Sequence, residues 1–296
     1  GYPILTSRGC PFNCTYCSVR EISGRAWRAR SPQNILDELH HAKDKHKIKE
    51  FYIVDDNFTL NMNRAKDFCQ MLVSEKMNLN WSCPNGVRAD SLDKELLCLM
   101  KESGCTSISL GIESGVPEVF GRIKKGEKLD DIENAVKMAK DCGVKVFGFF
   151  IIGLPGSTFE LDKKSVEFAK RIGLKEATWN LLVPYPRTEV WRWVQENGIV
   201  LRDWKEGYHF GAKPKIVFET REYTERERID AFYSANLAAQ NYAALVNENA
   251  PIIGLTYNLL KVILKYDSKN ILSHLWRLSS KVISKWSKKL SRWVEM

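Results

Sequence analysis

The sequence has no uncharged apolar run as long as the roughly 18 residues that a membrane-spanning helix needs. It opens on Gly1-Tyr2-Pro3-Ile4, without the basic stretch and following apolar run of a signal peptide. It has no internal repeat and no low-complexity segment. These absences argue against a membrane-spanning, secreted or repeat protein and favour an ordinary globular chain.

The composition fits that class. With 296 residues, 44% of them hydrophobic and 27% charged, the chain can form one large α/β domain with an accessory part. The initiator methionine is absent, so we expect a piece of a longer protein whose missing N-terminal part carried another domain. The net charge of +9 is uneven, because residues 261–296 carry +7 of it.

The most conspicuous motif of the sequence contains three cysteines, with no fourth thiolate nearby. Cys10, Cys14 and Cys17 have C-x3-C-x2-C spacing directly after a short β-prone run, and no further cysteine lies nearby. An iron–sulfur cube normally binds four thiolates. Three thiolates would leave one iron open, so the motif predicts a cluster whose free iron coordinates a substrate or cofactor.

Three other interpretations fit the motif less well. A structural zinc site needs four ligands, and the nearest histidines, His40 and His41, fall in a predicted helix well downstream. A disulfide framework is typical of small secreted chains. Packed core thiols do not suit a segment that Gly9, Pro11 and Asn13 mark as a turning loop.

The other five cysteines show no ligand spacing, and we predict that they are buried, reduced and apolar in character. Reduced thiols and an oxygen-labile cluster both indicate a cytoplasmic protein. The five are Cys69, Cys83, Cys98, Cys105 and Cys142.

Strands and helices alternate through the first 185 residues. Apolar runs bounded by turn residues predict six strands, at about 3–7, 51–54, 79–83, 107–112, 144–152 and 177–183. Helices between them begin at cap signals, such as Ser31-Pro32 and the capping box of Ser157 with Glu160, or end at Gly104, Gly143 and Gly173. Strict alternation predicts a parallel sheet with helices outside, as a partial (β/α)6 barrel.

The unusual residues all follow the carboxyl ends of these strands. They are the cysteines, the acids after residue 54, Arg88, Glu113 and the turn 153–156. In a β/α barrel that end is the active-site face. An open doubly wound sheet would also bind ligands there, but no G-x-G-x-x-G follows the first strand.

The chain is expected to divide into a core barrel (1–187), an irregular connecting segment (188–222) and a helical, basic C-terminal extension (223–296). Helices are predicted at 224–247 and from Pro251 onward. Residues 268–296 form an amphipathic pattern, with Trp276, Trp286 and Trp293 on an apolar side. Such a helix can lie on an anionic membrane or pack on protein. Nucleic-acid binding is a weaker third option, because basic residues confined to one amphipathic tail lack a recognisable binding fold.

Tyr16 directly precedes the last cysteine of the Cys10/Cys14/Cys17 motif, which lies at the end of the first strand of six β/α units. In these features residues 1–187 resemble the radical S-adenosylmethionine (SAM) superfamily. The resemblance implies a [4Fe–4S] cluster held by the three cysteines, with SAM chelating the fourth iron. One electron would cleave SAM to methionine and a 5′-deoxyadenosyl radical, which abstracts hydrogen from a substrate. It also implies a reductant such as ferredoxin or flavodoxin.

The resemblance further assigns SAM-binding positions. Asp55, Asp56 and Asn57 match the loop that receives the amino group of SAM, although they depart from the Gly-Gly-Glu form of many members. Arg88 is assigned to the carboxylate of SAM and Glu113 to its ribose or amino group. The alternatives are a solvated turn for the first three residues and a structural ion pair for the last two.

Two further positions complete the expected SAM site. Gly153 and Gly156 resemble the family's adenine-binding turn, with Ile151 or Ile152 facing the base, and the alternative is a plain strand-to-helix turn. Tyr16 is counted with the cofactor-binding residues because it adjoins Cys17.

Five strings resemble the cobalamin-associated branch, which includes hopanoid methylases and the anaerobic magnesium-protoporphyrin ester cyclase. They lie at 55–58, 85–90, 111–115, 153–156 and 184–186. This resemblance implies methyl transfer or a related modification of an organic small-molecule or lipid substrate, with cobalamin held by an N-terminal domain that this sequence lacks. The alternatives are a methylthiotransferase-like enzyme and an iron–sulfur electron carrier or degenerate cluster-binding scaffold.

Overall fold

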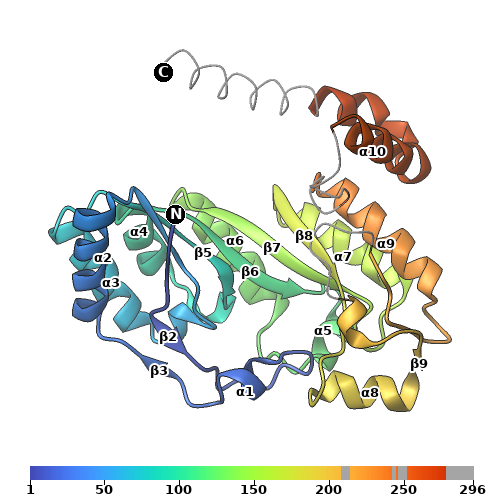
Figure 1. The fold of residues 1–296 in the computed structure, drawn as a ribbon, viewed down its shortest axis with the longest axis horizontal. Helices are drawn as coiled ribbons and strands as arrows, with labels where there is room; N and C mark the ends of the chain where they lie inside the picture. The colour runs from blue at the N-terminus through green and yellow to red at the C-terminus, as the bar shows by residue number, and fades with distance from the viewer. Residues whose placement is uncertain (208–213, 242–244, 246–251, 278–296) are drawn as a thin grey trace.

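The computed structural model describes residues 1–207, 214–241, 245 and 252–277, with the backbone alone for 252–258 (Figure 1). A six-stranded parallel sheet forms its centre, in the order β1-β4-β5-β6-β7-β8. The six strands are β1 (Tyr2–Ile4), β4 (Glu50–Ile53), β5 (Asn80–Val87), β6 (Cys105–Glu113), β7 (Lys145–Ile152) and β8 (Glu176–Leu181). Each strand pairs with the next one along the chain, so the predicted parallel (β/α)6 arrangement is confirmed.

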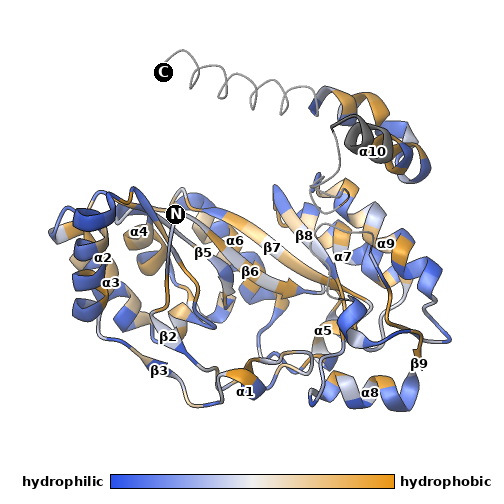
Figure 2. Cartoon of the chain, viewed as in Figure 1, coloured by the Kyte–Doolittle hydropathy of each residue, from blue (hydrophilic) through white to orange (hydrophobic). Residues whose placement is uncertain are grey.

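Helices connect the strands and cover the outside of the sheet (Figure 1). Strand β7 is mostly apolar and β6 is mixed, whereas the covering helices carry many polar residues (Figure 2), as expected for a sheet buried beneath helices. The connecting helices are α2 (Pro32–His46), α3 (Met62–Ser74), α4 (Lys94–Glu102), α5 (Pro117–Arg122), α6 (Leu129–Asp141) and α7 (Phe159–Arg171).

Smaller elements surround this core. Strands β2 (Ser7–Arg8) and β3 (Arg28–Ala29) pair antiparallel, as do β9 (Ile199–Val200) and β10 (Phe218–Glu219). The remaining elements are α1 (Val19–Ile22), α8 (Glu189–Asn197), α9 (Glu225–Ala238), α10 (Ile252–Tyr266) and the 3₁₀ turns η1 (Phe58–Leu60), η2 (Ala89–Ser91), η3 (Trp204–Gly207) and η5 (Ser268–Asn270).

Local signals in the sequence explain several helix ends. The Ser31 hydroxyl accepts a hydrogen bond from the Asn34 N–H, which is the expected N-cap of α2. Gly104, after α4, has φ +99°, and a Cβ there would lie 2.2 Å from the carbonyl oxygen of Leu79. Only glycine fits that combination of conformation and space, so the sequence signal for the end of α4 was sound.

Several boundaries differ from the sequence prediction. The first strand ends at Ile4 rather than at residue 7, because Ser7 pairs with β3 instead. Thr158, not Ser157, caps α7, because the Ser157 hydroxyl donates to Asp162 instead. The third strand continues to Val87, past the predicted end at residue 83. Helix α9 ends at Ala238 rather than 247. The extension of the third strand depends on pairing with β6, which lies further along the chain and which local patterns do not reveal.

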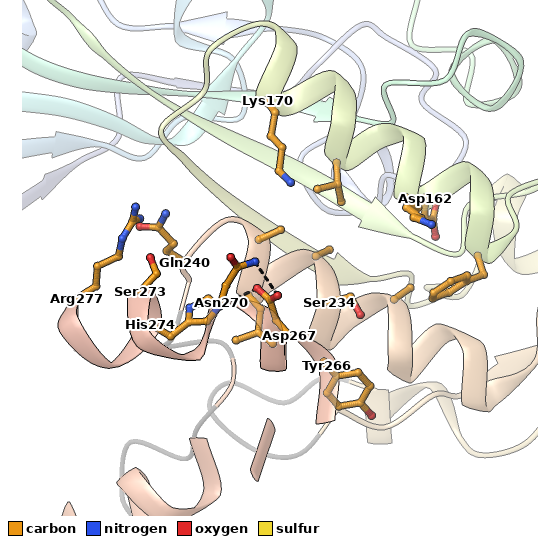
Figure 3. Close-up of a pocket in the computed structure, with 17 residues that line it drawn as sticks. Asp162, Lys170, Ser234, Gln240, Tyr266, Asp267, Asn270, Ser273, His274 and Arg277 are labelled. Carbon is orange, nitrogen blue, oxygen red and sulfur yellow. Dashed lines mark hydrogen bonds and ion pairs between the residues drawn. The ribbon is translucent and has the colours of Figure 1, made fainter. Parts of the chain in front are cut away.

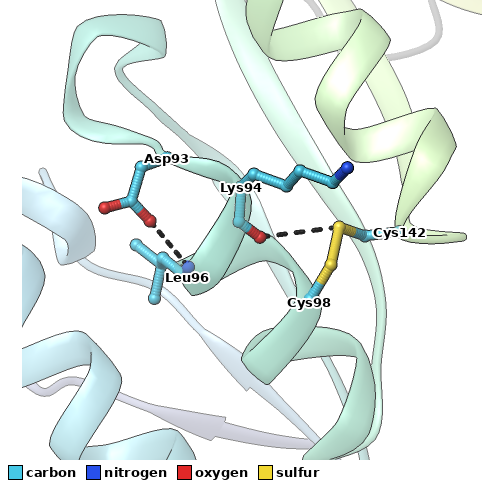
Figure 4. The surroundings of a disulfide bond; sticks show 5 residues. All are labelled: Asp93, Lys94, Leu96, Cys98 and Cys142. Atoms are coloured by element: carbon cyan, nitrogen blue, oxygen red, sulfur yellow. Dashed lines mark hydrogen bonds between the residues drawn. A yellow bond between two sulfur atoms is a disulfide. The ribbon is translucent and has the colours of Figure 1, made fainter.

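The prediction of reduced, buried thiols was wrong for two cysteines. Cys98 on α4 and Cys142 after α6 form a disulfide, and neither is fully buried (Figure 4). Their sequence separation of 44 hides the contact between α4 and α6 from sequence analysis. Cys69, Cys83 and Cys105 are buried free thiols, as expected.

The predicted C-terminal helix is described only in part, because residues 278–296 lie outside the described residues. In the described part, residues 271–277 are helical, and Leu272 and Trp276 are exposed. None of the described helices is long and apolar enough to cross a membrane.

Side-chain hydrogen bonds attach helix α9, in the C-terminal part of the chain, to the edge strand β8. The buried Asn236 amide accepts from the backbone N–H of Trp179 at 3.3 Å and donates to its carbonyl at 3.0 Å. The amide therefore forms hydrogen bonds with backbone groups of β8 that would otherwise have no partner, because β8 is an edge strand.

A second attachment, the Arg228 cluster, comprises Gly153, Ser157, Asp162, Tyr223 and Arg228. Arg228 Nη1 donates to the Gly153 carbonyl at 3.2 Å, and its Nε donates to the Tyr223 carbonyl at 3.1 Å. The Asp162 carboxylate accepts from Gly153 N–H, Ser157 Oγ and Tyr223 Oη at 3.0, 2.5 and 2.8 Å. Burial raises the pKa of Asp162 to about 6 and lowers that of Arg228 to about 10, so both groups remain charged at neutral pH.

We predict that Arg228→Ala lowers the free energy of unfolding by about 3–5 kcal/mol, because a buried carboxylate then loses its neighbouring cation. Urea unfolding of the apoprotein, followed by tryptophan fluorescence, measures this. Arg226 is exposed on the same helix, so Arg226→Ala is the matched control and should change little. Equal unfolding midpoints for the two variants would contradict the role given to the cluster.

Candidate functional site

The three predicted cysteines lie in one loop, and backbone hydrogen bonds hold the two ends of that loop together. Strands β2 and β3 pair across the loop ends, and the Cys10 N–H donates to the Gly24 carbonyl at 3.2 Å. Gly9 has φ +88°, and a Cβ there would lie 2.3 Å from the Ala26 carbonyl oxygen. Glycine is therefore required directly before the first cysteine.

Thr15, in the middle of the loop, holds it against two other elements. Its N–H donates to the Ile123 carbonyl at 3.0 Å, and its carbonyl accepts from the Val190 N–H, in the first turn of α8, at 2.9 Å. These bonds fix the segment that carries Cys14 and Cys17 from both sides.

The thiols are free and half-buried. Burial raises the pKa of all three, that of Cys14 to about 12, and the nearby Lys125 and Arg88 act in the opposite direction on Cys14. In the metal-free chain the thiols are therefore protonated at neutral pH, and metal binding would release their protons.

No group of three or more His, Cys, Asp and Glu side chains in the described ranges is arranged around a single metal position. A zinc site would gather its ligands about one ion. In a cube each thiolate binds a different iron, so its thiols need not converge on one point. The arrangement gives no support to the zinc alternative.

The three residues after β4 make different contacts. The buried Asp55 carboxylate accepts from the Thr6 N–H at 2.6 Å and from the Thr6 and Ser7 hydroxyls at 2.5 and 2.6 Å. Asp56 accepts from the Gly9 N–H at 2.9 Å. Both carboxylates thus bind the segment that enters the cysteine loop.

Asn57 differs from its two neighbours. Its side chain is buried, and neither amide atom has a hydrogen-bond partner among the described residues. The Thr15 hydroxyl is also buried without a partner in that part of the chain. Buried polar atoms without protein partners are rare in folded proteins, so both side chains keep hydrogen-bonding capacity for a bound molecule.

Arg88 and Glu113 are both buried, but no direct ion pair joins them in the described structure. Arg88 donates two hydrogen bonds to Asp90, at 2.9 and 2.6 Å. Its guanidinium also lies 3.5 Å from the ring centroid of Phe12 in the cysteine loop. Glu113 instead faces Lys125, with 3.4 Å between the charged atoms.

Lys125 and Glu127 complete this buried charged network. Lys125 Nζ lies 2.9 Å from Glu127 Oε2. The backbone carbonyl of Lys125 accepts a hydrogen bond from Arg88 Nη1 at 2.8 Å. Burial alone would lower the pKa of Lys125, but Glu113 and Glu127 raise it overall, so the ammonium stays charged. Sequence analysis missed both residues, because a run of charges before a helix usually indicates a solvent-exposed loop.

Glu113 has an unusual backbone. At the end of β6 it adopts φ +66°, and the register with β7 shifts between Gly111 and Glu113. Such conformations in a residue other than glycine are costly and concentrate at functional sites. Burial raises the pKa of Tyr16, and the negative charge of Glu113 raises it further.

The turn after β7 belongs to the Arg228 cluster. Gly153 and Gly156 have φ +83° and +77°, and a Cβ at either would overlap an arginine side chain, that of Arg228 or Arg122. The positive φ favours glycine at both positions, and the buried Arg228 guanidinium occupies the space beside Gly153. Ile152 is buried in the core, while Ile151 is half-buried on the other face of β7.

A cavity of about 630 Å³ adjoins the thiols. The three cysteines line it together with Phe12, Thr15, charged residues of α1 and the first turn of α8. A second cavity of about 490 Å³ lies away from the cysteines, between α7 and residues 266–277 (Figure 3). In it, Asn270 and His274 both contact the Asp267 carboxylate.

Comparison with known proteins agrees with this site. The family model of the radical SAM superfamily matches residues 4–183. An uncharacterized methyltransferase of Pyrococcus horikoshii is 35% identical over 204 residues, which cover 69% of this chain and 44% of that protein. A cytidylyl-2-hydroxyethylphosphonate methyltransferase of Streptomyces wedmorensis is also 35% identical, over 67% of this chain and 38% of that protein. The chain thus spans less than half the length of these relatives.

Among solved structures, the cobalamin-dependent SAM radical enzyme OxsB, with aqua-cobalamin and SAM bound, has the same fold. The TM-score is 0.63 at 19% identity, covering 94% of this chain and 50% of that one. A hopanoid C-2 methylase and an anaerobic magnesium-protoporphyrin IX monomethyl ester cyclase, the two kinds of relative that the sequence suggested, are also similar. The chain therefore belongs to the radical SAM superfamily, with relatives in its cobalamin-dependent branch.

Proposed function

We propose that the chain binds a [4Fe–4S] cluster on Cys10, Cys14 and Cys17 and cleaves SAM reductively, so that an organic substrate is activated for methyl transfer. The observation that supports this most is the position of the three free thiols, at the carboxyl ends of a parallel barrel and beside a buried charged network. When bound, the cluster supplies one electron for cleavage of SAM to methionine and a 5′-deoxyadenosyl radical.

The surroundings of the thiols fit such a ligand. Asn57 offers an unpartnered amide oxygen at the end of β4, which suits the amino group of SAM. Asp55 and Asp56 are engaged with the cysteine-loop backbone and hydroxyls, so we assign them mainly to positioning that loop.

Charged residues would bind the rest of SAM. Arg88, held by Asp90 and stacked on Phe12, provides a fixed cation for the carboxylate of SAM. Glu113, with Tyr16 beside it, provides an acceptor for the ribose or amino group. Both roles remain predictions.

The turn at Gly153 and Gly156 would bring backbone close to the adenine. Ile151 suits contact with the base better than Ile152, because the Ile152 side chain is buried with Phe150, which stacks on Trp179. We retain residues 1–187 as the catalytic core, and a cobalamin domain would have to lie outside this sequence.

We predict that the anaerobically reconstituted chain, given SAM and a strong reductant, forms 5′-deoxyadenosine, and that Cys14→Ala abolishes this by removing one cluster ligand. Product formation is measured by liquid chromatography. Cys69→Ala, which removes a buried thiol on α3 remote from the loop, is the matched control and should retain activity. An intact cluster with no product above the Cys14→Ala level would favour the electron-carrier or scaffold alternative.

A second prediction separates Asn57 from Asp55. Asn57→Ala should weaken SAM binding about tenfold or more, since a hydrogen bond to a charged group contributes about 1.5–3 kcal/mol, while the chain keeps its stability. Asp55→Asn should instead lower the free energy of unfolding and the iron content after reconstitution, because the segment before the cysteine loop loses an acceptor. Equilibrium binding of SAM, urea unfolding and iron analysis distinguish the two effects, and the reverse pattern would contradict these assignments.

A further inference from the structure

We propose that a groove between α7 and α9 binds an anionic amphiphile, a molecule with a phosphate or carboxylate group and an apolar body. The groove consists of the cavity of about 490 Å³ described above and a further cavity of about 510 Å³ that adjoins it. No cysteine lines either cavity, and neither Arg88 nor Glu113 does. The site is therefore distinct from the cluster, and the inference does not rest on the proposed function.

The two cavities meet at a junction that carries positive charge. Five residues line both cavities, and they comprise two cations, one amide and no acid: Val166, Lys170, Ala238, Gln240 and Arg277. Figure 3 shows Lys170 extending from α7 toward the cavity, with Gln240 and Arg277 next to each other. Ammonium, guanidinium and amide groups all donate hydrogen bonds, so the junction suits the charged end of an anion.

The protein leaves this positive charge largely uncompensated. Neither Lys170 nor Lys175, which lines the further cavity, has an ion-pair partner within the described ranges. No carboxylate lines the further cavity. The two in the other cavity already accept hydrogen bonds from the protein, Asp162 within the Arg228 cluster and Asp267 from neighbouring side chains. The groove thus favours a negatively charged occupant.

An apolar wall continues from the junction. Leu174, Ala177 and Trp179 line the further cavity, and the last two are buried. Trp179 also keeps an unused donor, because its indole N–H is buried without a partner in that part of the chain. Binding cavities of this size are typically apolar with a few polar groups that orient the ligand. An inorganic anion would leave the wall unused, so the lining favours an anion with an apolar body.

The groove lies away from the catalytic end of the barrel. Ala177 is near the amino-terminal end of β8, whereas catalytic groups of a β/α barrel follow the carboxyl ends of the strands. The occupant is therefore an accessory ligand and not the molecule on which the cluster acts. Because it would contact both α7 and α9, it should stabilise their association by mass action.

The test uses the full chain with its cluster reconstituted anaerobically, in the absence of SAM, and octyl phosphate as the probe below its micelle-forming concentration. Isothermal titration should show saturable binding of octyl phosphate. Inorganic phosphate, which lacks the apolar body, and octyltrimethylammonium, which has the opposite charge, should each bind at least about tenfold more weakly. Equal affinity for either of these two compounds would overturn the proposal.

Lys170→Gln should raise the dissociation constant for octyl phosphate about tenfold, because the junction loses a charged donor. Lys164→Gln is the matched control, since Lys164 is exposed on the same helix and lines neither cavity. Equal dissociation constants for the two variants would contradict binding at the junction.

A second variant tests the shape of the site without changing its charge. Ala238 lines both cavities and is only partly buried, so Ala238→Leu should fill the junction while the urea unfolding midpoint stays near that of the unmodified chain. Binding of octyl phosphate should weaken about tenfold or more. A folded Ala238→Leu chain with unchanged affinity would contradict the proposed position.

Hydrogen exchange followed by mass spectrometry locates the probe. Octyl phosphate should slow exchange in α7 and α9 and leave the cysteine loop, residues 9–24, unchanged. Slower exchange in the cysteine loop alone would overturn the proposal.

The same anionic chemistry is offered by a free molecule and by a lipid headgroup, and flotation distinguishes these sources. The chain is mixed with phosphatidylcholine vesicles that contain or lack phosphatidic acid. Flotation that needs phosphatidic acid and is lost in Lys170→Gln would support a lipid source, whereas octyl phosphate binding without flotation would support a free molecule. Absence of both would contradict the proposal.

Discussion

The buried carboxylate of Asp55 is the interaction on which the site depends most. From the end of β4 it accepts three hydrogen bonds from Thr6 and Ser7, the residues that lead from β1 into the cysteine loop. Hydrogen bonds to a buried charge are stronger than neutral ones, and an unpaired carboxylate there would be costly. The first two strands of the sheet are thereby joined at their carboxyl ends, and Gly9 and Thr15 then fix the loop that carries the thiols.

The same edge of the sheet holds several charges out of solvent, and each is compensated by the protein itself. Arg88 has Asp90, Lys125 has Glu113 and Glu127, and Arg228 lies in a cluster with Asp162. Buried pairs contribute little net stability compared with apolar packing. Their value here is positional, because they fix cations and acceptors at the strand ends where a charged cofactor would bind.

Local sequence signals were sufficient for the sheet, its order and the cysteine motif. Alternating apolar runs and turn residues depend on neighbours in sequence, and Gly104 and Ser31 behave as those signals predict. The roles of Lys125 and Arg228 could not be predicted, because their partners lie on other elements and charge alone suggests exposure. For the same reason the Cys98–Cys142 disulfide was missed, while Asn57 and Asp55 looked equivalent until their contacts were known.

The central claim is that three thiolates leave one iron free for SAM, and Mössbauer spectroscopy of the chain reconstituted with ⁵⁷Fe tests it most directly. Three cysteines are available in the loop, so one of the four irons should differ from the others. The account predicts that adding SAM changes the signal of that single iron and leaves the other three as they were. A spectrum that SAM does not alter, or four equivalent irons in its absence, would contradict it.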